Sequence, residues 1–394
     1  MIWCEPSYIK EFHCIADKCS DTCCAGWEIV LDEDALECYE QTEGSFGKRL
    51  RQEIKRDGDE AYFALTREKR CPFLDEHNLC EIYQELGEDA LCDICTEHPR
   101  FYNWVGDYTE KGLGLCCEEA ERLMFAEKAP MYLEIHRDGD EEEISDDLKV
   151  LLQIRAEAMS ILQDRELEFE ERMQEFLAYM ESVQLALEGQ EDKLSEGDFS
   201  EEELPESESI ERDTSDDELF EAASHESQIY EPEICDPEIH EPESSGTEIY
   251  EKMTANLTYE NVQELLTFFR KLDYLDQRLV EILKNAQENC ANILTHGLKL
   301  LREDKERLYE WEHVAVYFLY RYMTEAVYDS DVLTRSRLVA VCLKMLALLA
   351  GQIALTEGYT EQKRDELLRM FSREIEYCPE NMEAVFEAIR GGMY

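Results

Sequence analysis

The feature that most constrains this chain is a run of four cysteines within eleven residues, two of them adjacent: Cys14, Cys19, Cys23 and Cys24. A second set follows at Cys71, Cys80, Cys92, Cys95, Cys116 and Cys117. Twelve of the sixteen cysteines therefore lie in the first 117 residues. Cysteine used only as a small core residue would be scattered along the chain. The clustering indicates a site.

The first residues contain no basic stretch followed by an apolar one, so we expect no secretory signal and a cytoplasmic location. In a reducing compartment cysteines stay as thiols and are available to metal. A disulfide framework is the alternative use of so many cysteines.

The formal net charge of −55 and the pI near 4.3 argue against a nucleic-acid partner, because binding a polyanion needs a basic face. An acidic chain suits a basic partner, such as a lysine-bearing protein. Solubility alone is the other explanation of the acidity.

The hydrophobic pattern predicts a mainly α fold, in which a metal-tied cysteine-rich region of short helices and loops precedes a helical domain. Apolar residues recur at helical spacing over 146–187 and again from about 258 to the end. Within the second stretch we expect helices at 289–303, 308–328, 333–356, 361–376 and 380–390, with breaks at Gly297, Gly351 and Gly358. The predicted divisions are 1–125 (cysteine-rich), 126–187 (helical), 188–250 (acidic) and 251–394 (helical).

Residues 188–243 hold 23 acidic and 2 basic residues and end in a five-residue repeat that contains proline. Regularly spaced proline forbids a helix, and such a composition cannot bury enough apolar surface to fold. We predict a disordered linker or insertion. Attraction of a basic partner is a second possible role.

The segment 338–355 is apolar and about long enough to cross a bilayer. It contains Lys344 and Gln352, and no aromatic belt flanks it. Because charge within a span is costly, we predict a buried core helix and no membrane span.

Thiolates are soft ligands that select zinc or iron–sulfur clusters in a reducing cell. Cys92 and Cys95 form a CxxC pair, whose two sulfurs can reach one metal. Zinc-finger spacing and the CxxxCxxC motif are absent. The side chains of Cys23 and Cys24 diverge, so this pair either serves two metals or has one structural member. Nine thiols are candidate ligands: Cys14, Cys19, Cys23, Cys24, Cys71, Cys80, Cys92, Cys95 and Cys117.

Two alternatives concern the same residues. A redox dithiol would need a thioredoxin-like strand and helix around the CxxC pair, which its flanks do not supply. His98 and then His13 are the best histidines for ligation, although each is more typical of packing or surface. Glycine-rich nucleotide loops and the GxSxG elbow are absent.

The N-terminal part resembles the flagellin lysine-N-methylase family, and so does the aromatic run at 317–322 with Tyr328 and Asp329. The matching N-terminal pieces are Phe12–Ile15, Cys19, Asp21–Cys24, Gly26–Trp27, Cys71–Leu74, Leu79–Tyr83, Gly87–Glu88, Leu91–Cys92, Cys95, Pro99–Arg100, Cys117, Glu119–Ala120 and Arg122. The span from Cys71 to Pro99 is also similar to a broader group of small domains named for zinc or iron chelation.

The resemblance implies methylation of flagellin lysine side chains with S-adenosylmethionine as donor. It also implies an iron–sulfur cluster, or alternatively zinc, in the cysteine-rich part. Glu119, Tyr320 and Tyr322 are candidates for handling the lysine amine by their position in matched motifs; donor-binding and catalytic residues are otherwise unassigned. The competing hypothesis is a non-catalytic metal-binding module with a helical protein-interaction domain.

Overall fold

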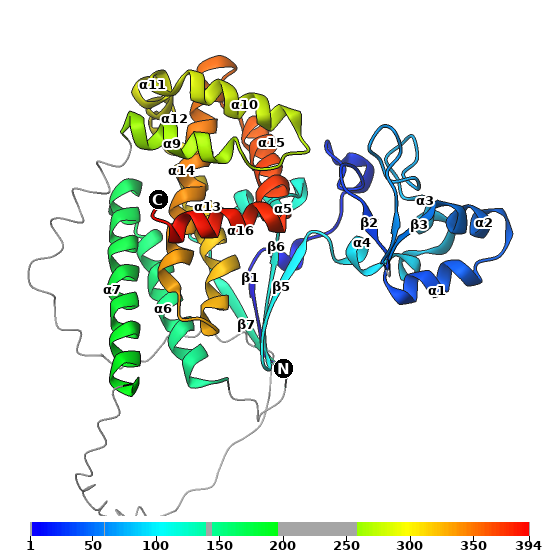
Figure 1. Ribbon diagram of the computed structural model, residues 1–394, viewed down its shortest axis with the longest axis horizontal. Coiled ribbons are helices and arrows are strands. Elements are labelled where there is room, and N and C mark those ends of the chain that lie inside the picture. Colours follow the sequence, from blue (N-terminus) through cyan, green and yellow to red (C-terminus); the bar gives the residue numbers. More distant parts are fainter. Residues whose placement is uncertain (1, 59, 139–143, 196–257, 394) are drawn as a thin grey trace, which may run out of the picture.

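The computed structural model describes residues 2–58, 60–138, 144–195 and 258–393, with the backbone alone over 190–195. Figure 1 shows two parts: a small lobe formed by residues of the cysteine-rich region, and a larger body of helices with one sheet. The predicted acidic linker lies outside the described residues, apart from its first few positions, over which helix α7 continues to Ser195.

The small lobe, which we call the cysteine lobe, packs short helices on a three-stranded sheet. Its strands are β2 (Ile29–Val30), β3 (Ile54–Asp57) and β4 (Glu60–Phe63), in the order β2-β4-β3. Its helices are α1 (Glu33–Gln41), α2 (Gly44–Glu53), α3 (Glu81–Leu86) and α4 (Asp93–Glu97). The core between them is apolar and includes the aromatic rings of Tyr39, Phe63 and Phe73.

A four-stranded sheet lies in the body. Its strands are β1 (Ile2–Pro6), β5 (Arg100–Val105), β6 (Tyr108–Leu113) and β7 (Leu133–Arg137), in the order β5-β6-β1-β7. β1 pairs in parallel with β6, whereas the other pairs are antiparallel. In β1 and β6 buried residues alternate with half-exposed ones, because one face of the sheet packs on helices.

The body contains α5 (Glu118–Ala126), α6 (Asp146–Leu162), α7 (Phe169–Ser195), α9 (Tyr259–Phe269), α10 (Gln277–Glu288), α11 (Cys290–Asn292), α12 (Leu298–Glu303), α13 (Leu308–Met323), α14 (Val332–Thr356), α15 (Glu361–Phe371) and α16 (Pro379–Arg390). Two five-residue π-helices interrupt this series: η5 (Ile293–Gly297) and η8 (Ser372–Glu376). The mainly α prediction is confirmed, whereas neither sheet was predicted from the sequence.

Helix α14 is the centre of the body. It is long and apolar enough to cross a membrane, yet 72% of its most apolar window is buried inside the protein. Burial lowers the pKa of Lys344 on this helix. The packing agrees with the prediction of a buried core helix.

The prediction that Gly297 and Gly351 break helices is wrong. Gly297 ends π-helix η5 within a continuous helical run, and Gly351 lies inside α14. The two glycines meet where these helices cross: a Cβ added to Gly297 would lie 2.9 Å from the carbonyl oxygen of Gly351. They permit a close helix crossing, whereas Gly358, at φ +80°, does follow the end of α14.

Candidate functional site

Five of the nine predicted thiols come together in the cysteine lobe, and we call them the Cys24 group: Cys24, Cys71, Cys80, Cys92 and Cys95. Cys24 interacts electrostatically with Cys71, Cys80 and Cys95, and Cys92 does so with Cys71 and Cys80. The thiols of Cys92 and Cys95 share a hydrogen bond. Three segments far apart in the sequence thus supply one set of soft sulfur donors.

Backbone hydrogen bonds bring these segments together. The N–H of Cys71 donates to the carbonyl of Cys24 at 2.8 Å, beside a bridge between Ala25 and Arg70. Asp32 caps α1 by accepting from the N–H of Ala35 at 2.8 Å. Its other oxygen accepts from the N–H of Asp93 at 2.7 Å, next to Cys92. One carboxylate therefore ties α1 to the CxxC segment.

The other four predicted thiols, Cys14, Cys19, Cys23 and Cys117, form a second set that we call the Cys23 group. Cys23 interacts electrostatically with Cys14 and Cys117, and Cys117 does so with Cys19. The expectation that the side chains of Cys23 and Cys24 diverge is wrong: Cys23 donates a hydrogen bond to Cys24, so the adjacent pair links the two groups. All fifteen cysteines among the described residues are free thiols.

The two groups consist mostly of protonated thiols. Burial raises the pKa of Cys71 to about 12 and that of Cys117 to about 11. The hydrogen bond from Cys23 lowers the pKa of Cys24 to about 7. Each thiolate would raise the pKa of its neighbours, and a bound cation would reverse this effect. Within the described parts of the chain, no three Cys, His, Asp or Glu side chains already surround a point where a metal could bind.

His98 connects the cysteine lobe to the body. Its ring lies 5.4 Å from that of Trp27 and 5.9 Å from that of Tyr377, and its Nε2 lies 3.7 Å from Sγ of Cys116. Burial, aided by Arg373, lowers the pKa of His98 to about 4. The imidazole is therefore neutral at pH 7. It contacts Cys116, which is outside the nine predicted thiols, and the other predicted histidine, His13, is exposed.

Charged side chains hold the loop around Cys19 and Cys23 against the body. Asp21 pairs with Arg373 at 3.0 Å and with Arg369 at 3.7 Å. Glu118 on α5 accepts from the N–H of Ser20 at 2.8 Å and from its hydroxyl at 2.5 Å. These contacts fix the Cys23 group at the border between the two parts of the molecule.

The aromatic run of α13 contributes a buried cluster beside this border. The guanidinium of Arg321 lies 4.6 Å from the ring of Phe101 and 4.9 Å from that of Tyr377. Tyr317 and Tyr322 both donate hydrogen bonds to Glu376. We call Tyr317, Arg321, Tyr322 and Glu376 the Glu376 cluster. The sequence analysis did not identify Glu376, and its only signal was its place between the apolar Ile375 and Tyr377.

The structure separates the three candidates for handling the amine. Glu119 forms an ion pair with Arg122, whose Nε lies 2.7 Å from Oε2 of Glu119. The hydroxyl of Tyr320 is buried and bonds the carbonyls of Cys4 and Lys111, so it ties α13 to the sheet. Tyr322 alone belongs to the Glu376 cluster.

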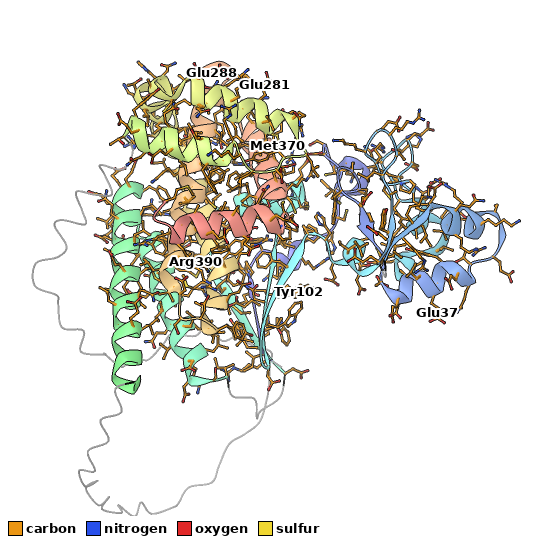
Figure 2. The ribbon with its side chains drawn as sticks, viewed as in Figure 1. Glu37, Tyr102, Glu281, Glu288, Met370 and Arg390 are labelled. Carbon is orange, nitrogen blue, oxygen red and sulfur yellow. The ribbon has the colours of Figure 1, made fainter. Side chains whose placement is uncertain are left out.

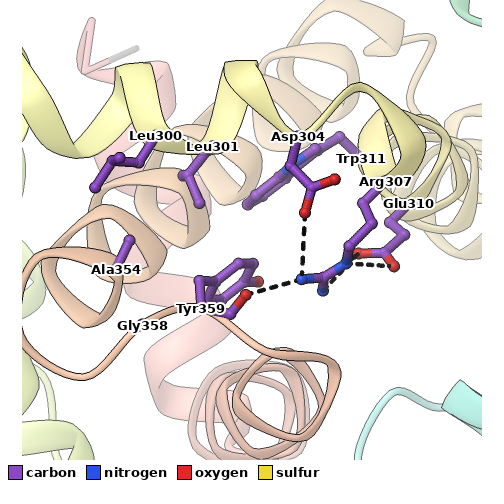
Figure 3. Close-up of a pocket in the computed structure, with 9 residues that line it drawn as sticks. All are labelled: Leu300, Leu301, Asp304, Arg307, Glu310, Trp311, Ala354, Gly358 and Tyr359. Atoms are coloured by element: carbon purple, nitrogen blue, oxygen red, sulfur yellow. Dashed lines mark hydrogen bonds and ion pairs between the residues drawn. The ribbon is translucent and has the colours of Figure 1, made fainter.

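A cavity of about 200 Å³ lies elsewhere in the body, between α12, α13 and the end of α14 (Figure 3). Arg307 crosses it and bonds the carbonyl of Tyr359 at 2.9 Å and the carboxylate of Glu310 at 2.9 Å. No predicted thiol lines this cavity.

The labelled side chains in Figure 2 show how far the lobe extends, with Glu37 on α1 in the lobe and Tyr102 on β5 of the body.

The fold and the site define a class: a mainly α protein with an N-terminal lobe that gathers thiols. Comparison with known proteins finds a family match for the cysteine lobe and another for the helical body. Residues 155–392, more than half of the chain, match the "FliB lysine N-methylase C-terminal domain", and residues 13–111 match a "Putative zinc- or iron-chelating domain". The chain belongs to the FliB lysine N-methylase family.

Named relatives agree with this assignment. The flagellar biosynthetic protein FliU of Salmonella muenchen is 30% identical over 124 residues, which are 29% of this chain and 72% of FliU. The lysine-N-methylase of Salmonella typhimurium is 29% identical over 124 residues, which are 29% of this chain and 30% of that enzyme. The alignment thus spans less than a third of the latter. No solved structure matches.

Proposed function

We propose that this protein is a lysine N-methyltransferase that modifies flagellin side chains, with S-adenosylmethionine as methyl donor, in the cytoplasm. The observation that carries the proposal is the family match over residues 155–392. The names of the relatives support flagellin as substrate, since one is a flagellar biosynthetic protein and others are lysine-N-methylases. The net negative charge of the chain favours a lysine-bearing partner.

We further propose that the Cys24 group holds a metal centre, an iron–sulfur cluster or alternatively zinc. The chemistry of the donors supports this proposal, because soft metals select thiolates and five thiols interact electrostatically within one lobe. Among the described residues these side chains do not already surround a metal position, so binding would have to draw them together. The Cys23 group adds four thiols at the border with the body. The adjacent pair Cys23 and Cys24 faces both groups, which supports the interpretation that the pair serves two centres. A metal here would supply thiolate-ligated redox or structural chemistry.

Lysine methylation sets two requirements on the chain's own residues. The ε-amine must be neutral, because only the lone pair attacks the methyl carbon, and it must lie in line with the carbon–sulfur bond. A group that accepts the amine proton must lie within hydrogen-bond distance. The buried polar groups at the border between lobe and body could meet both requirements. Burial favours the neutral form of the amine, and the buried oxygen atoms can accept its proton.

The test is transfer of isotope-labelled methyl groups from S-adenosylmethionine to purified flagellin, with modified lysines located by mass spectrometry. We expect labelled lysines with wild-type protein. The control is flagellin acetylated on its lysines, which should receive no label. If anaerobically purified protein binds metal but transfers no methyl group, the non-catalytic metal-binding module becomes the better explanation.

A further inference from the structure

One oxygen of Glu376 is buried without a partner. The side chain is 0% exposed. Its Oε2 accepts from the hydroxyls of Tyr317 at 2.9 Å and Tyr322 at 3.1 Å, and lies 3.3 Å from Nε of Arg321. Its Oε1 has no hydrogen-bond partner among the described residues. A buried carboxylate oxygen that lacks a donor is costly, so it indicates a place for a water, an ion or a ligand.

The local backbone is unusual at this position. Glu376 ends the π-helix η8, and rare π-turns often occur at functional sites. The next residue, Tyr377, lies against both His98 and Cys116. Tyr377 therefore connects Glu376 to the border between lobe and body, where the Cys23 group lies.

The charges around Glu376 favour a neutral ligand. Arg321 already balances the carboxylate. Burial raises the pKa of Tyr317 and Tyr322 on α13 and of Cys342 on α14, so all three are neutral at pH 7. Burial likewise raises the pKa of Tyr377. A second cation would be uncompensated at this depth, whereas a neutral amine can donate its N–H to Oε1.

We propose that the Glu376 cluster is the site that receives the substrate lysine, as a neutral amine bonded to Oε1 of Glu376. This assignment rests on the proposed function. The amine lone pair forms the nitrogen–carbon bond as the carbon–sulfur bond of the sulfonium donor breaks, and that electron pair stays on sulfur. The methylated nitrogen then gives a proton to Oε1, from which it passes to solvent.

Tyr322 forms the solvent side of the cluster. Tyr322 is partly exposed, whereas Tyr317 is 2% exposed, so Tyr322 is the outer member of the cluster. Its ring packs edge-on against Phe386 of α16 at 6.2 Å. Its hydroxyl bonds Oε2 of Glu376, which leaves Oε1 free for the incoming amine.

The experiment measures binding of Nα-acetyl-lysine-methylamide to the full-length protein by calorimetry at pH 7.5 and pH 9.5. The free lysine pKa is about 10.4, so the neutral fraction rises about tenfold per pH unit and the affinity should rise up to about 100-fold. Glu376→Gln should abolish binding, and Tyr322→Phe should weaken it about tenfold. The matched controls, Glu374→Gln on the same π-helix and Tyr309→Phe on α13, should bind as wild type does.

Glu376→Gln leaves Arg321 without its anion and could destabilise the fold. Circular dichroism therefore accompanies each variant, and Tyr322→Phe keeps the test decisive because it removes only a hydroxyl. The proposal is overturned if the probe shows no saturable binding at pH 9.5, if affinity is independent of pH, or if both cluster variants bind like wild type.

Methyl transfer separates this inference from the proposed function. If Glu376→Gln methylates flagellin at the wild-type rate, the site assignment fails and the methylase function stands. If the wild-type protein binds the probe as described but transfers no methyl group, the amine site stands and the methylase function fails.

Discussion

At the scale of single residues, the Cys24 group depends on a few backbone contacts. The nine candidate thiols were predictable, because clustered cysteines without an export signal suggest metal ligands. Their division into two groups was not predictable. It depends on the pairing of Cys24 with Cys71, which are 47 positions apart, and no local pattern encodes that contact. Whether each thiol binds metal stays a prediction.

Replacing Cys24 by serine should remove most of the bound metal, because Cys24 interacts electrostatically with three other thiols of its group. Cys38→Ser is the matched control: Cys38 lies in the same lobe, is partly buried, and is outside both groups. Metal content per chain, measured after anaerobic purification with circular dichroism as a check of folding, decides the matter. Equal metal content in the two variants would remove Cys24 from the ligand set.

His98 should make the protein less stable in acid. Its pKa is about 4 in the folded state and near 6.5 when unfolded. Between these values only the unfolded chain binds the proton, so stability is full above pH 6.5 and is lost as the pH falls towards 4. At pH 5 the loss amounts to about 2 kcal/mol.

The measurement is the difference in urea midpoint between pH 7 and pH 5 for wild type and His98→Gln, which should show a smaller difference. His13→Gln, at an exposed position, should retain the wild-type difference. An unchanged pH dependence in His98→Gln would show that burial of the neutral His98 ring does not cause the loss of stability in acid.

At the scale of elements, helical periodicity predicted the helices from α11 to α16 closely because each carries its own apolar stripe. The stretch from about 258 to 288, which was predicted only as helical, is two helices, α9 and α10. The strands were missed for a physical reason. β1 pairs with β6 and β7, more than 100 residues away, and its alternation spans only five residues. The predicted helix over 146–187 is two helices, α6 and α7, separated at the charged stretch around Glu166.

The glycine crossing makes a prediction for helices η5 and α14. Alanine at Gly297 would place a Cβ 2.9 Å from a backbone oxygen, whereas alanine at Gly351 would meet the side chain of Ile293 at 3.1 Å. Backbone cannot yield as a side chain can, so Gly297→Ala should cost about 1–3 kcal/mol. Gly351→Ala should cost less, because the helix propensity of alanine offsets part of the strain.

Thermal or urea unfolding of the two variants tests this order. Gly189→Ala, where an added Cβ meets nothing within 4 Å, serves as the control for propensity alone. A Gly297→Ala variant as stable as wild type would show that the crossing is looser than the structure indicates.

At the scale of the whole molecule, the two parts are joined by residues that belong to both. Asp21 and Ser20 of the cysteine lobe bind α5 and the arginines of α15 and η8. His98 lies between Trp27 of the lobe and Tyr377 of the body. The lobe is therefore fixed beside the Glu376 cluster, and we expect loss of its metal to affect the body as well.

Whether the cysteine lobe holds a metal centre is decided by the iron, zinc and acid-labile sulfide content of anaerobically purified protein, together with its absorption spectrum. We expect iron with sulfide and a broad absorbance near ~400 nm, as thiolate-ligated clusters give. Stoichiometric zinc in a colourless protein would replace the cluster by a structural zinc centre. Protein that contains no metal while all its lobe thiols react freely would contradict the claim that the cysteine lobe is a metal centre.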